Sequence, residues 1–295
     1  MISPGRVAPG VFPPEQQALA KAIACELPAR RGLPLSRLSV DEIRQELIDQ
    51  GAVSSISRST VWRWLHQDAL RPGYHRSWQV RKDPDFLPKA QRVLELYQGR
   101  WEGQPLGRND HVICADEKTG LQILERIAPT QPPQPGRAMR VEHEYRRRGT
   151  ACYLAGLDVR TGQVIGRLEE RNGKAPFLAW LDQVMAQKPY RAARRVFLVV
   201  DNGGAHHPAT FAERVRDAYP NIVVVHLPKH ASWLNQIELY FSIYHRKVLT
   251  PNDCPDRATL AERTGAFEAR YNRRARPFHW QFTVHQLREM MKRVE

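Results

Sequence analysis

Three acidic residues stand where one sheet could present their carboxylates to a single point. Asp116 directly follows the apolar run 112–115, Asp201 directly follows the apolar run 196–200, and Glu238 lies in the amphipathic segment after the next apolar run. Open α/β sheets bind their ligands beyond the carboxyl ends of the strands, so we expect Asp116 and Asp201 to face each other. At ~100° per residue, Glu238 falls on the border of the apolar face of its helix, where its carboxylate can lean toward the sheet.

Crowded carboxylates repel one another and therefore need a cation. Hard oxygen ligands with open coordination positions suit Mg²⁺ or Mn²⁺. Two such ions, ~3.5–4 Å apart, can activate a water or a 3′-hydroxyl against a phosphodiester without a covalent nucleophile. We therefore predict that Asp116, Asp201 and Glu238 are both the catalytic residues and the ligands of two metal ions. Taken singly, each also has a plainer interpretation, as a turn after a strand, a surface charge or an ion-paired helix residue.

Other side chains near these acids are expected to support the site without binding an ion. They are Asn202, His207 and Asn235. No Cys or His stands at ligand spacing from His207, so we interpret it as a supporting or loop residue. The four cysteines are scattered and contain no CxxC pair, which argues against a zinc finger and a disulfide framework. The phosphate-loop and nucleophile-elbow motifs of NTPases and α/β-hydrolases are absent from the sequence.

The elements that would position the acids occupy residues 109–295, the predicted catalytic domain. Strands are expected at 112–115, 121–127, 151–159, 163–168, 196–200 and 222–227, and helices at 174–187, 208–219 and 232–249, with two more from about residue 258 onward. Ser232 is the expected cap of the helix that carries Glu238. Strands that come first in a meander and then alternate with helices predict a mixed α/β sheet covered on both sides.

Residues 1–70 predict a small all-α domain of three helices. The first begins near 13–15 with Leu19, Ile23 and Leu27 on one stripe. A capping box from Ser39 to Glu42 opens the second, and Ser57 caps the third.

The third helix turns a polar face outward, which consists of Arg58, Ser59, Arg63 and His66. This pattern is typical of a helix-turn-helix unit whose third helix enters the major groove, and we predict that these four residues contact DNA. A plain three-helix bundle with an arginine-rich surface is the alternative. Residues 71–108 are interpreted as a basic linker and a connecting helix.

The charge of the chain also favours nucleic acid as a partner. Its 295 residues carry 45 Lys and Arg against 31 Asp and Glu, a formal net charge of +14, and such a balance attracts polyanions. Arginines cluster at 137, 140 and 146–148, and we predict that Arg146, Arg147 and Arg148 contact DNA phosphates near the active site; a solvated loop is the alternative. The sequence lacks both a run of ~18 apolar residues and the apolar core of a signal peptide, so a cytoplasmic protein is expected.

Several blocks of the sequence resemble a known family. They are CADEKTG around Asp116, FLVVDNGGAHH around Asp201, and LPKHASWLNQIELYFSIYHRKVL around Glu238. All three resemble bacterial insertion-sequence transposases of the mariner-related, IS-six-thirty type. EHEYRRRGT at 142–150 and ARPFHWQFT at 275–283 are also similar to that group, and the resemblance runs from about residue 35 to the end.

The resemblance implies an RNase H-like fold with a DDE triad, which falls on Asp116, Asp201 and Glu238. It implies Mg²⁺-dependent nicking at the ends of a mobile element and strand transfer of the freed 3′-hydroxyl into target DNA. It further implies binding of terminal inverted repeats by the N-terminal helices, a homodimer on DNA and a bacterial, nucleoid-associated location. Family members usually carry a further helix-turn-helix before the one found here, so the resemblance implies a shortened N-terminus.

Two other functions fit parts of the sequence. A DNA-binding repressor or transposase relic would occupy inverted repeats without cutting them, which the shortened N-terminus would favour. A host RNase H-like nuclease would degrade RNA–DNA hybrids, although the helix-turn-helix pattern argues against it.

Overall fold

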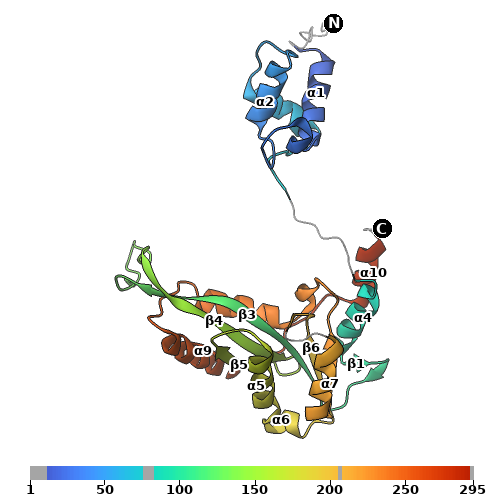
Figure 1. Ribbon diagram of the computed structural model, residues 1–295, viewed down its shortest axis with the longest axis vertical. Helices are drawn as coiled ribbons and strands as arrows, with labels where there is room; N and C mark the ends of the chain where they lie inside the picture. Colours follow the sequence, from blue (N-terminus) through green and yellow to red (C-terminus); the bar gives the residue numbers. More distant parts are fainter. Residues whose placement is uncertain (1–11, 76–82, 205–207, 293–295) are drawn as a thin grey trace, which may run out of the picture. The chain divides into compact units, whose positions relative to one another are not determined.

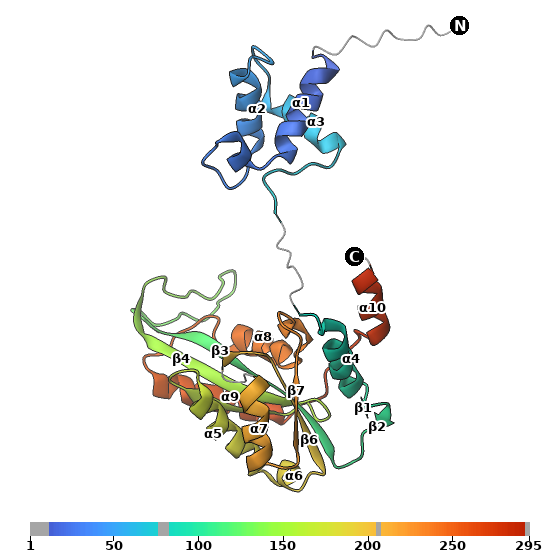
Figure 2. The same cartoon turned by 45° about the vertical axis from the view of Figure 1, so that its right-hand side comes forward.

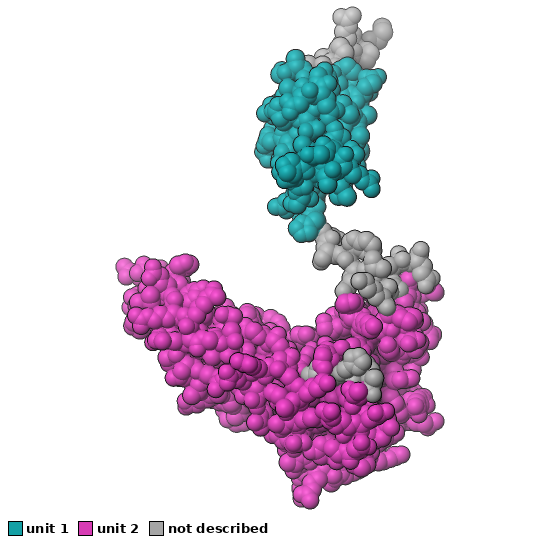
Figure 3. All heavy atoms as spheres, in the orientation of Figure 1, with its two compact units in different colours: residues 1–80 teal, residues 81–295 magenta. Residues whose placement is uncertain are grey.

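The computed structural model describes residues 12–75, 83–204 and 208–292. The chain forms two compact units, Met1–Val80 and Arg81–Glu295 (Figure 3). Separate sets of buried apolar side chains stabilise the two units, so each is described by itself.

The first unit is all-α in its described part, as predicted. Its elements are α1 (Pro14–Cys25), the 3₁₀ turn η1 (Pro28–Arg31), α2 (Val40–Asp49) and α3 (Arg58–Gln67). The capping box of α2 is confirmed, because the Glu42 N–H donates to Ser39 Oγ at 3.2 Å and the Ser39 N–H donates to the Glu42 carboxylate. Ser57 Oγ caps α3 by accepting from the Thr60 N–H at 3.1 Å. Local hydrogen bonds thus start α2 and α3 at the predicted residues.

Leu27 does not join the apolar stripe of α1, contrary to the prediction. The helix ends at Cys25, and the Leu27 side chain is 63% exposed. Pro28 disfavours helical backbone at the preceding residue, and Leu27 is extended, with φ −70° and ψ 134°. The stripe is made instead by Ala20 and Ile23, which are fully buried.

The second unit is built on a mixed sheet. In the described part of this unit five strands pair in the order β5-β4-β3-β6-β7 (Figures 1 and 2). They are β3 (Asp110–Arg126), β4 (Tyr145–Asp158), β5 (Val164–Glu169), β6 (Arg195–Val200) and β7 (Ile222–His226), while β1 (Arg100–Trp101) and β2 (Gln104–Pro105) form a separate small hairpin. β3 pairs antiparallel with β4 and parallel with β6. The predicted RNase H-like α/β fold is confirmed.

Helices cover both faces of the sheet. α4 (Phe86–Tyr97), α8 (Ile237–Val248), α9 (Arg257–Asn272) and α10 (Val284–Lys292) contribute to the core on one side. α5 (Lys174–Met185), α6 (Lys188–Arg191) and α7 (Pro208–Ala218) belong to the other side. β6 is buried from Val196 to Val200, as its unbroken apolar run predicted, because a strand covered on both faces needs apolar side chains on both.

The strands predicted at 112–115 and 121–127 are one long strand, β3. A register shift between Lys118 and Leu121 lets the strand bend while its pairing with β4 continues. β4 starts at Tyr145, six residues before the strand predicted at 151–159. Its added residues, 145–150, are all exposed and lack the apolar alternation from which strands are recognised. The paired ends of β3 and β4 project beyond the rest of the unit (Figure 1).

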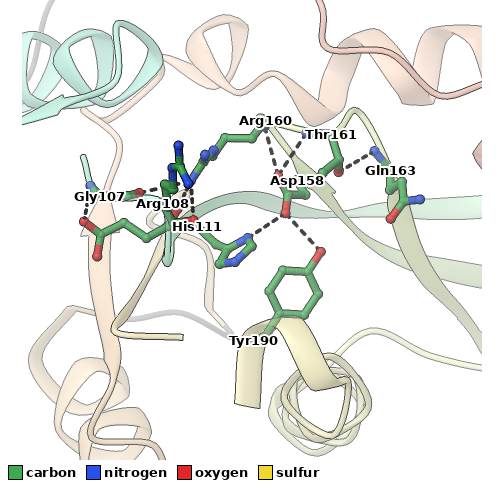
Figure 4. A network of polar contacts seen from close by, with 9 residues as sticks. Gly107, Arg108, His111, Asp158, Arg160, Thr161, Gln163 and Tyr190 are labelled. Atoms are coloured by element: carbon green, nitrogen blue, oxygen red, sulfur yellow. Dashed lines mark hydrogen bonds and ion pairs between the residues drawn. The ribbon is translucent and has the colours of Figure 1, made fainter. Parts of the chain in front are cut away.

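A buried carboxylate joins three elements at the opposite end of β4 (Figure 4). Asp158 Oδ2 accepts from His111 Nδ1 and from the Tyr190 hydroxyl, both at 3.1 Å. Asp158 Oδ1 accepts from the backbone N–H groups of Arg160 at 2.9 Å and Thr161 at 3.3 Å. Asp158 is 2% exposed, so these bonds replace water for its charge. They fix β3, α6 and the turn after β4 to one another.

None of the described helices is both long enough and apolar enough to cross a membrane.

Candidate active site

The strand register brings Asp116 and Asp201 to the same level of the sheet. Cys114 of β3 is the partner of Val199 in the parallel strand β6. Asp116 and Asp201 each lie two residues after this pair in the sequence. The Gly203 N–H donates to Asp201 Oδ1 at 2.8 Å, and the Glu117 N–H donates to Asp116 Oδ1 at 2.8 Å. The two aspartates therefore lie at the same level of the sheet. The prediction that Asp116 follows the end of a strand is wrong, because β3 continues past it to Arg126 through its pairing with β4.

The helix that carries Glu238 starts later than predicted. Ser232–Leu234 form a 3₁₀ turn, Asn235 is extended, and α8 begins at Ile237 without a side-chain cap. Contacts with other elements explain the break: the Tyr97 hydroxyl donates to the Leu234 carbonyl at 2.7 Å, and Asn235 Nδ2 donates to the Ala115 carbonyl at 3.0 Å. Because Ala115 precedes Asp116, this bond ties the start of α8 to β3. Glu238 lies in the first turn of α8 and is exposed.

The three carboxylates are electrostatic neighbours. Burial, together with the negative charges of Asp201, Glu117 and Glu238, raises the pKa of Asp116 from 3.8 to about 7, although the hydrogen bond from the Glu117 N–H acts in the opposite direction. Both causes penalise the charged form of the Asp116 carboxyl. A cation placed among these acids would remove that penalty.

The donor chemistry fits a divalent cation, because carboxylate oxygens are the hard ligands that Mg²⁺ and Mn²⁺ prefer. However, the described residues contain no group of three His, Cys, Asp or Glu side chains close enough to form a ready ligand set. Glu238 is exposed and does not form such a group with Asp116 and Asp201. The amide of Asn235 donates to the Ala115 carbonyl through Nδ2, whereas its Oδ1 is buried and has no hydrogen-bond partner.

A cleft of about 420 Å³ opens beside Asp201. Asp201, Asn202 and Gly203 form one wall, and residues 228–232 form the other. Lys229 and His230 lie in this second wall, directly after β7. Lys229 was not among the predicted site residues, although the rule that ligands gather beyond the ends of parallel strands applies to β7 as well. The Lys229 N–H donates to the buried carboxylate of Asp83 at 2.9 Å, which fixes the loop.

The residues predicted to support the carboxylates have different environments. Asn202 Nδ2 donates to the Leu227 carbonyl at 2.6 Å and so connects the loop after β6 to the end of β7. Asn235 is 1% exposed and holds the start of α8, as described above. His207 lies outside the described residues.

A tyrosine network lies beneath α8. The Tyr153 hydroxyl of β4 donates to Glu268 Oε2 of α9 at 2.8 Å, and the Tyr240 hydroxyl of α8 lies 3.1 Å from the Tyr153 oxygen. Both tyrosines are fully buried, and burial raises the pKa of the Glu268 carboxyl. Because Tyr240 belongs to α8 and Tyr153 to β4, the network fixes α8 against the sheet, two residues after Glu238.

Gly166 of β5 makes room for that network, and Gly166→Ala should destabilise the chain. A Cβ at Gly166 would lie 2.2 Å from the Tyr153 hydroxyl oxygen. We expect a loss of about 1–3 kcal/mol of unfolding free energy, because the ring must shift in a packed core. Gly265→Ala in α9 is the matched control: a Cβ there meets nothing within 4 Å, so it should stabilise by about 0.4–1 kcal/mol. Urea unfolding followed by circular dichroism measures both, and a neutral Gly166→Ala would contradict the expectation.

In the first unit, all four residues predicted to contact DNA are exposed on α3. The Arg58 guanidinium pairs with Asp41 of α2 at 3.0 Å, which occupies part of its charge. Ser59 Oγ lies 2.9 Å from Ser57 Oγ, and Arg63 bonds to Thr60 Oγ1 at 3.3 Å. The His66 ring is stacked on Trp62, a residue that the sequence analysis did not select.

The three arginines predicted to contact phosphates lie in the exposed part of β4. Arg148 pairs with Glu125 of β3 at 2.6 Å. Arg146 and Arg147 are exposed on successive positions, so their side chains leave opposite faces of the projecting strand pair.

The mixed sheet with helices on both faces is the RNase H-like class of fold predicted from the sequence, and it carries Asp116 and Asp201 at the same level of two neighbouring parallel strands. The family described as DDE superfamily endonuclease matches residues 111–261, which include all three carboxylates. The chain belongs to this family.

Several solved structures of similar fold are complexes of the Mos1 transposase. The Mos1 mariner paired-end complex with Mn is 14% identical, with a TM-score of 0.54, over 99% of this chain and 80% of that one. The pre-cleavage Mos1 transpososome is 13% identical, with the same TM-score and coverage. The Mos1 paired-end complex with Mg is 14% identical, with a TM-score of 0.52, over 98% and 80%. No match was found among curated protein sequences.

Proposed function

We propose that this protein is an insertion-sequence transposase that cuts and rejoins DNA at the ends of a mobile element. Asp116, Asp201 and Glu238 are its catalytic carboxylates and hold Mg²⁺ or Mn²⁺, with two ions in the complete site. The observation that carries the proposal is that Asp116 and Asp201 lie at the same level of neighbouring parallel strands, in a DDE endonuclease domain, with the charges of Asp201 and Glu238 both acting on Asp116. The solved Mos1 complexes of similar fold, which include paired ends and crystals with Mn or Mg, also support it.

Each part of the second unit has a role in this reaction. The bound metal would supply an activated water or 3′-hydroxyl and would stabilise the leaving oxygen. Lys229 and His230 face the same cleft as Asp201 and can bind a DNA phosphate. A second cavity, of about 420 Å³, has Lys118, Arg126 and His245 in its lining, so phosphates can also be bound along the part of β3 that follows Asp116. In the first unit, α3 acts as the recognition helix of a helix-turn-helix and binds terminal inverted repeats, and the active form on DNA is a homodimer.

The test uses a duplex that carries the inverted repeats flanking the gene. The native chain should nick this DNA in the presence of Mg²⁺ and transfer the freed 3′-end to target DNA, while Asp201→Ala should do neither. Equal cleavage by the two chains would refute the proposal. Salt-sensitive binding of the repeats without any nicking would instead support the alternative of a non-catalytic DNA-binding relic.

The arginines of β4 provide a separate prediction about DNA binding. Replacing Arg146, Arg147 and Arg148 together with alanine should flatten the plot of log K against log salt by about 2, since each phosphate contact contributes ~0.9 to the slope. Arg148→Ala alone is the control and should change the slope little, because Arg148 pairs with Glu125. Fluorescence anisotropy with one labelled duplex at several salt concentrations measures the slopes. Identical slopes for the native and triple-substituted chains would exclude phosphate contacts here.

A further inference from the structure

The exposed face of α3 carries a large aromatic side chain among polar and charged ones. Trp62 is 50% exposed, although the same helix buries Val61 and Leu65 on its other side. The neighbouring Trp64 packs edge-on against Phe12, with ring centroids 5.4 Å apart, and so belongs to the core side. Burial in the three-helix core therefore does not explain why α3 has an indole at position 62.

The indole of Trp62 is held in a fixed orientation. The His66 ring, one helical turn later, stacks on it with centroids 4.7 Å apart and an interplanar angle of 11°. A side chain that is ordered before binding loses less conformational entropy when it meets a partner. One face of the indole is covered by His66, which leaves the opposite face and the ring edge for contact with another molecule.

The surroundings of Trp62 favour a polyanion with an apolar feature. Arg58 precedes it and His66 follows it at four-residue spacing, so the three residues form one stripe along the helix. Arg63 lies on the adjacent exposed stripe. The Arg63 guanidinium can attract a DNA phosphate beside Trp62. The major groove admits an α-helix, and the 5-methyl group of thymine is the apolar feature that it displays.

We propose that Trp62 is a specificity-determining residue that reads a thymine in the major groove by packing its indole against the 5-methyl group. His66 is the positioning residue that keeps the indole in place. The inference rests on the proposed function, because it requires that α3 be the recognition helix for the element's ends. It assigns the base contact to Trp62, which was not among the predicted DNA-binding residues, and leaves Arg58 to a structural pair with Asp41.

The first experiment selects binding sites from a pool of random 30-base-pair duplexes, with the full-length chain in each case. The native chain should enrich one motif with a conserved thymine. Trp62→Ala should enrich the same motif without preference at that position, and Trp62→Phe should keep part of it. Trp233→Ala is the matched control, since Trp233 is a tryptophan of similar exposure, 45%, in the second unit, and it should enrich the native motif.

The second experiment replaces the conserved thymine with deoxyuridine in the selected duplex, which removes only the methyl group. The affinity of the native chain should fall about fourfold, the factor that one buried methyl-sized group contributes, while that of Trp62→Ala should stay unchanged. Equal thymine preference and an equal deoxyuridine effect in both chains would overturn the inference and leave the proposed function intact. If the native chain enriches no motif, sequence-specific binding by α3 fails, and this inference fails with it.

Discussion

Asp116→Asn is expected to lower the rate of DNA strand cleavage by about 10³-fold or more while making the folded chain more stable above neutral pH. Loss of one preorganised group that stabilises charge in a transition state typically costs 10²–10³-fold, and here a metal ligand is lost as well. The amide keeps the size of the carboxyl, so packing at the end of β3 should be preserved. Activity should fall while stability rises, because a functional group that destabilises the folded chain is removed.

The stability change follows from the direction of the pKa shift. The folded chain raises the pKa of Asp116 to about 7, whereas an aspartate in an unfolded chain titrates near ~3.9. The folded state therefore binds the proton more tightly than the unfolded state. The contribution of the protonated Asp116 to the unfolding free energy is complete below pH ~4 and is lost as the pH rises through 7. Asp116→Asn removes the penalty of the buried charge, so its unfolding free energy should exceed the native value by on the order of 1–4 kcal/mol at pH 8. The difference should fall to roughly 1–2 kcal/mol at pH 5 and should vanish only below pH ~4.

Thermal unfolding by circular dichroism at pH 5 and pH 8, with and without MgCl₂, measures this effect without relying on activity. Magnesium should raise the native midpoint at pH 8 and should leave that of Asp116→Asn nearly unchanged, because the ion binds the folded carboxylates. Asp217→Ala, at an exposed position of α7, is the control for a lost aspartate and should match the native chain in every measurement. Asp116→Asn with native cleavage activity would remove Asp116 from the active site.

Asp158→Ala should destabilise the second unit by about 3–5 kcal/mol, the usual cost of removing one partner from a buried charged network. The substitution leaves the His111 ring, the Tyr190 hydroxyl and two backbone N–H groups without their common acceptor. Each buried donor then carries its own desolvation penalty. Asp158→Asn should cost less, because its amide oxygen can still accept from the backbone of Arg160 and Thr161.

The pH dependence of this second effect has the opposite sign. Burial opposes the charged form of Asp158, but the hydrogen bonds from His111 and from the Arg160 N–H outweigh it and hold the pKa of Asp158 below 3.8. Its contribution is therefore complete above the unfolded pKa of ~3.9 and is lost as the pH falls through the folded value. Urea unfolding at pH 7 and pH 3 should show a large difference between native and Asp158→Ala at pH 7 and a smaller one at pH 3. A difference that stays constant would attribute the loss to packing rather than to charge.

The elements that bury an apolar face are the ones that could be predicted from the sequence. The run 196–200 became β6, and the stripe of Ile237, Phe241, Tyr244 and Val248 became the buried face of α8. The helix caps at Ser39 and Ser57 could also be predicted, because each hydroxyl bonds to a backbone N–H only three residues later. By contrast, the exposed part of β4, from Tyr145 to Thr150, is held only by its partner strand, so it leaves no apolar pattern to recognise.

Ser232 shows where local signals fail. Serine is a good helix cap, yet the helix starts at Ile237. The Leu234 carbonyl accepts a hydrogen bond from the Tyr97 hydroxyl, and the Asn235 amide donates one to the Ala115 carbonyl. Those partners are more than a hundred residues away in the chain, and no local rule can anticipate them. Likewise, Lys229 entered the site only because β7 lies beside β6 and ends at the same edge.

The sequence by itself determined the residue types of the site and the alternation of strands and helices after β5, since these depend on hydrophobic period and chain order. It also placed Asp116 and Asp201 after two apolar runs that became neighbouring parallel strands. Only the tertiary structure decided that Asp116 is buried enough to hold its proton near neutrality and that Glu238 stays exposed at the start of α8. It also decided which buried side chains would join the elements of the second unit by hydrogen bonds, as Asp158 does. Burial and charge–charge distance are properties of the packed chain, and they are set by residues brought together from distant parts of the sequence.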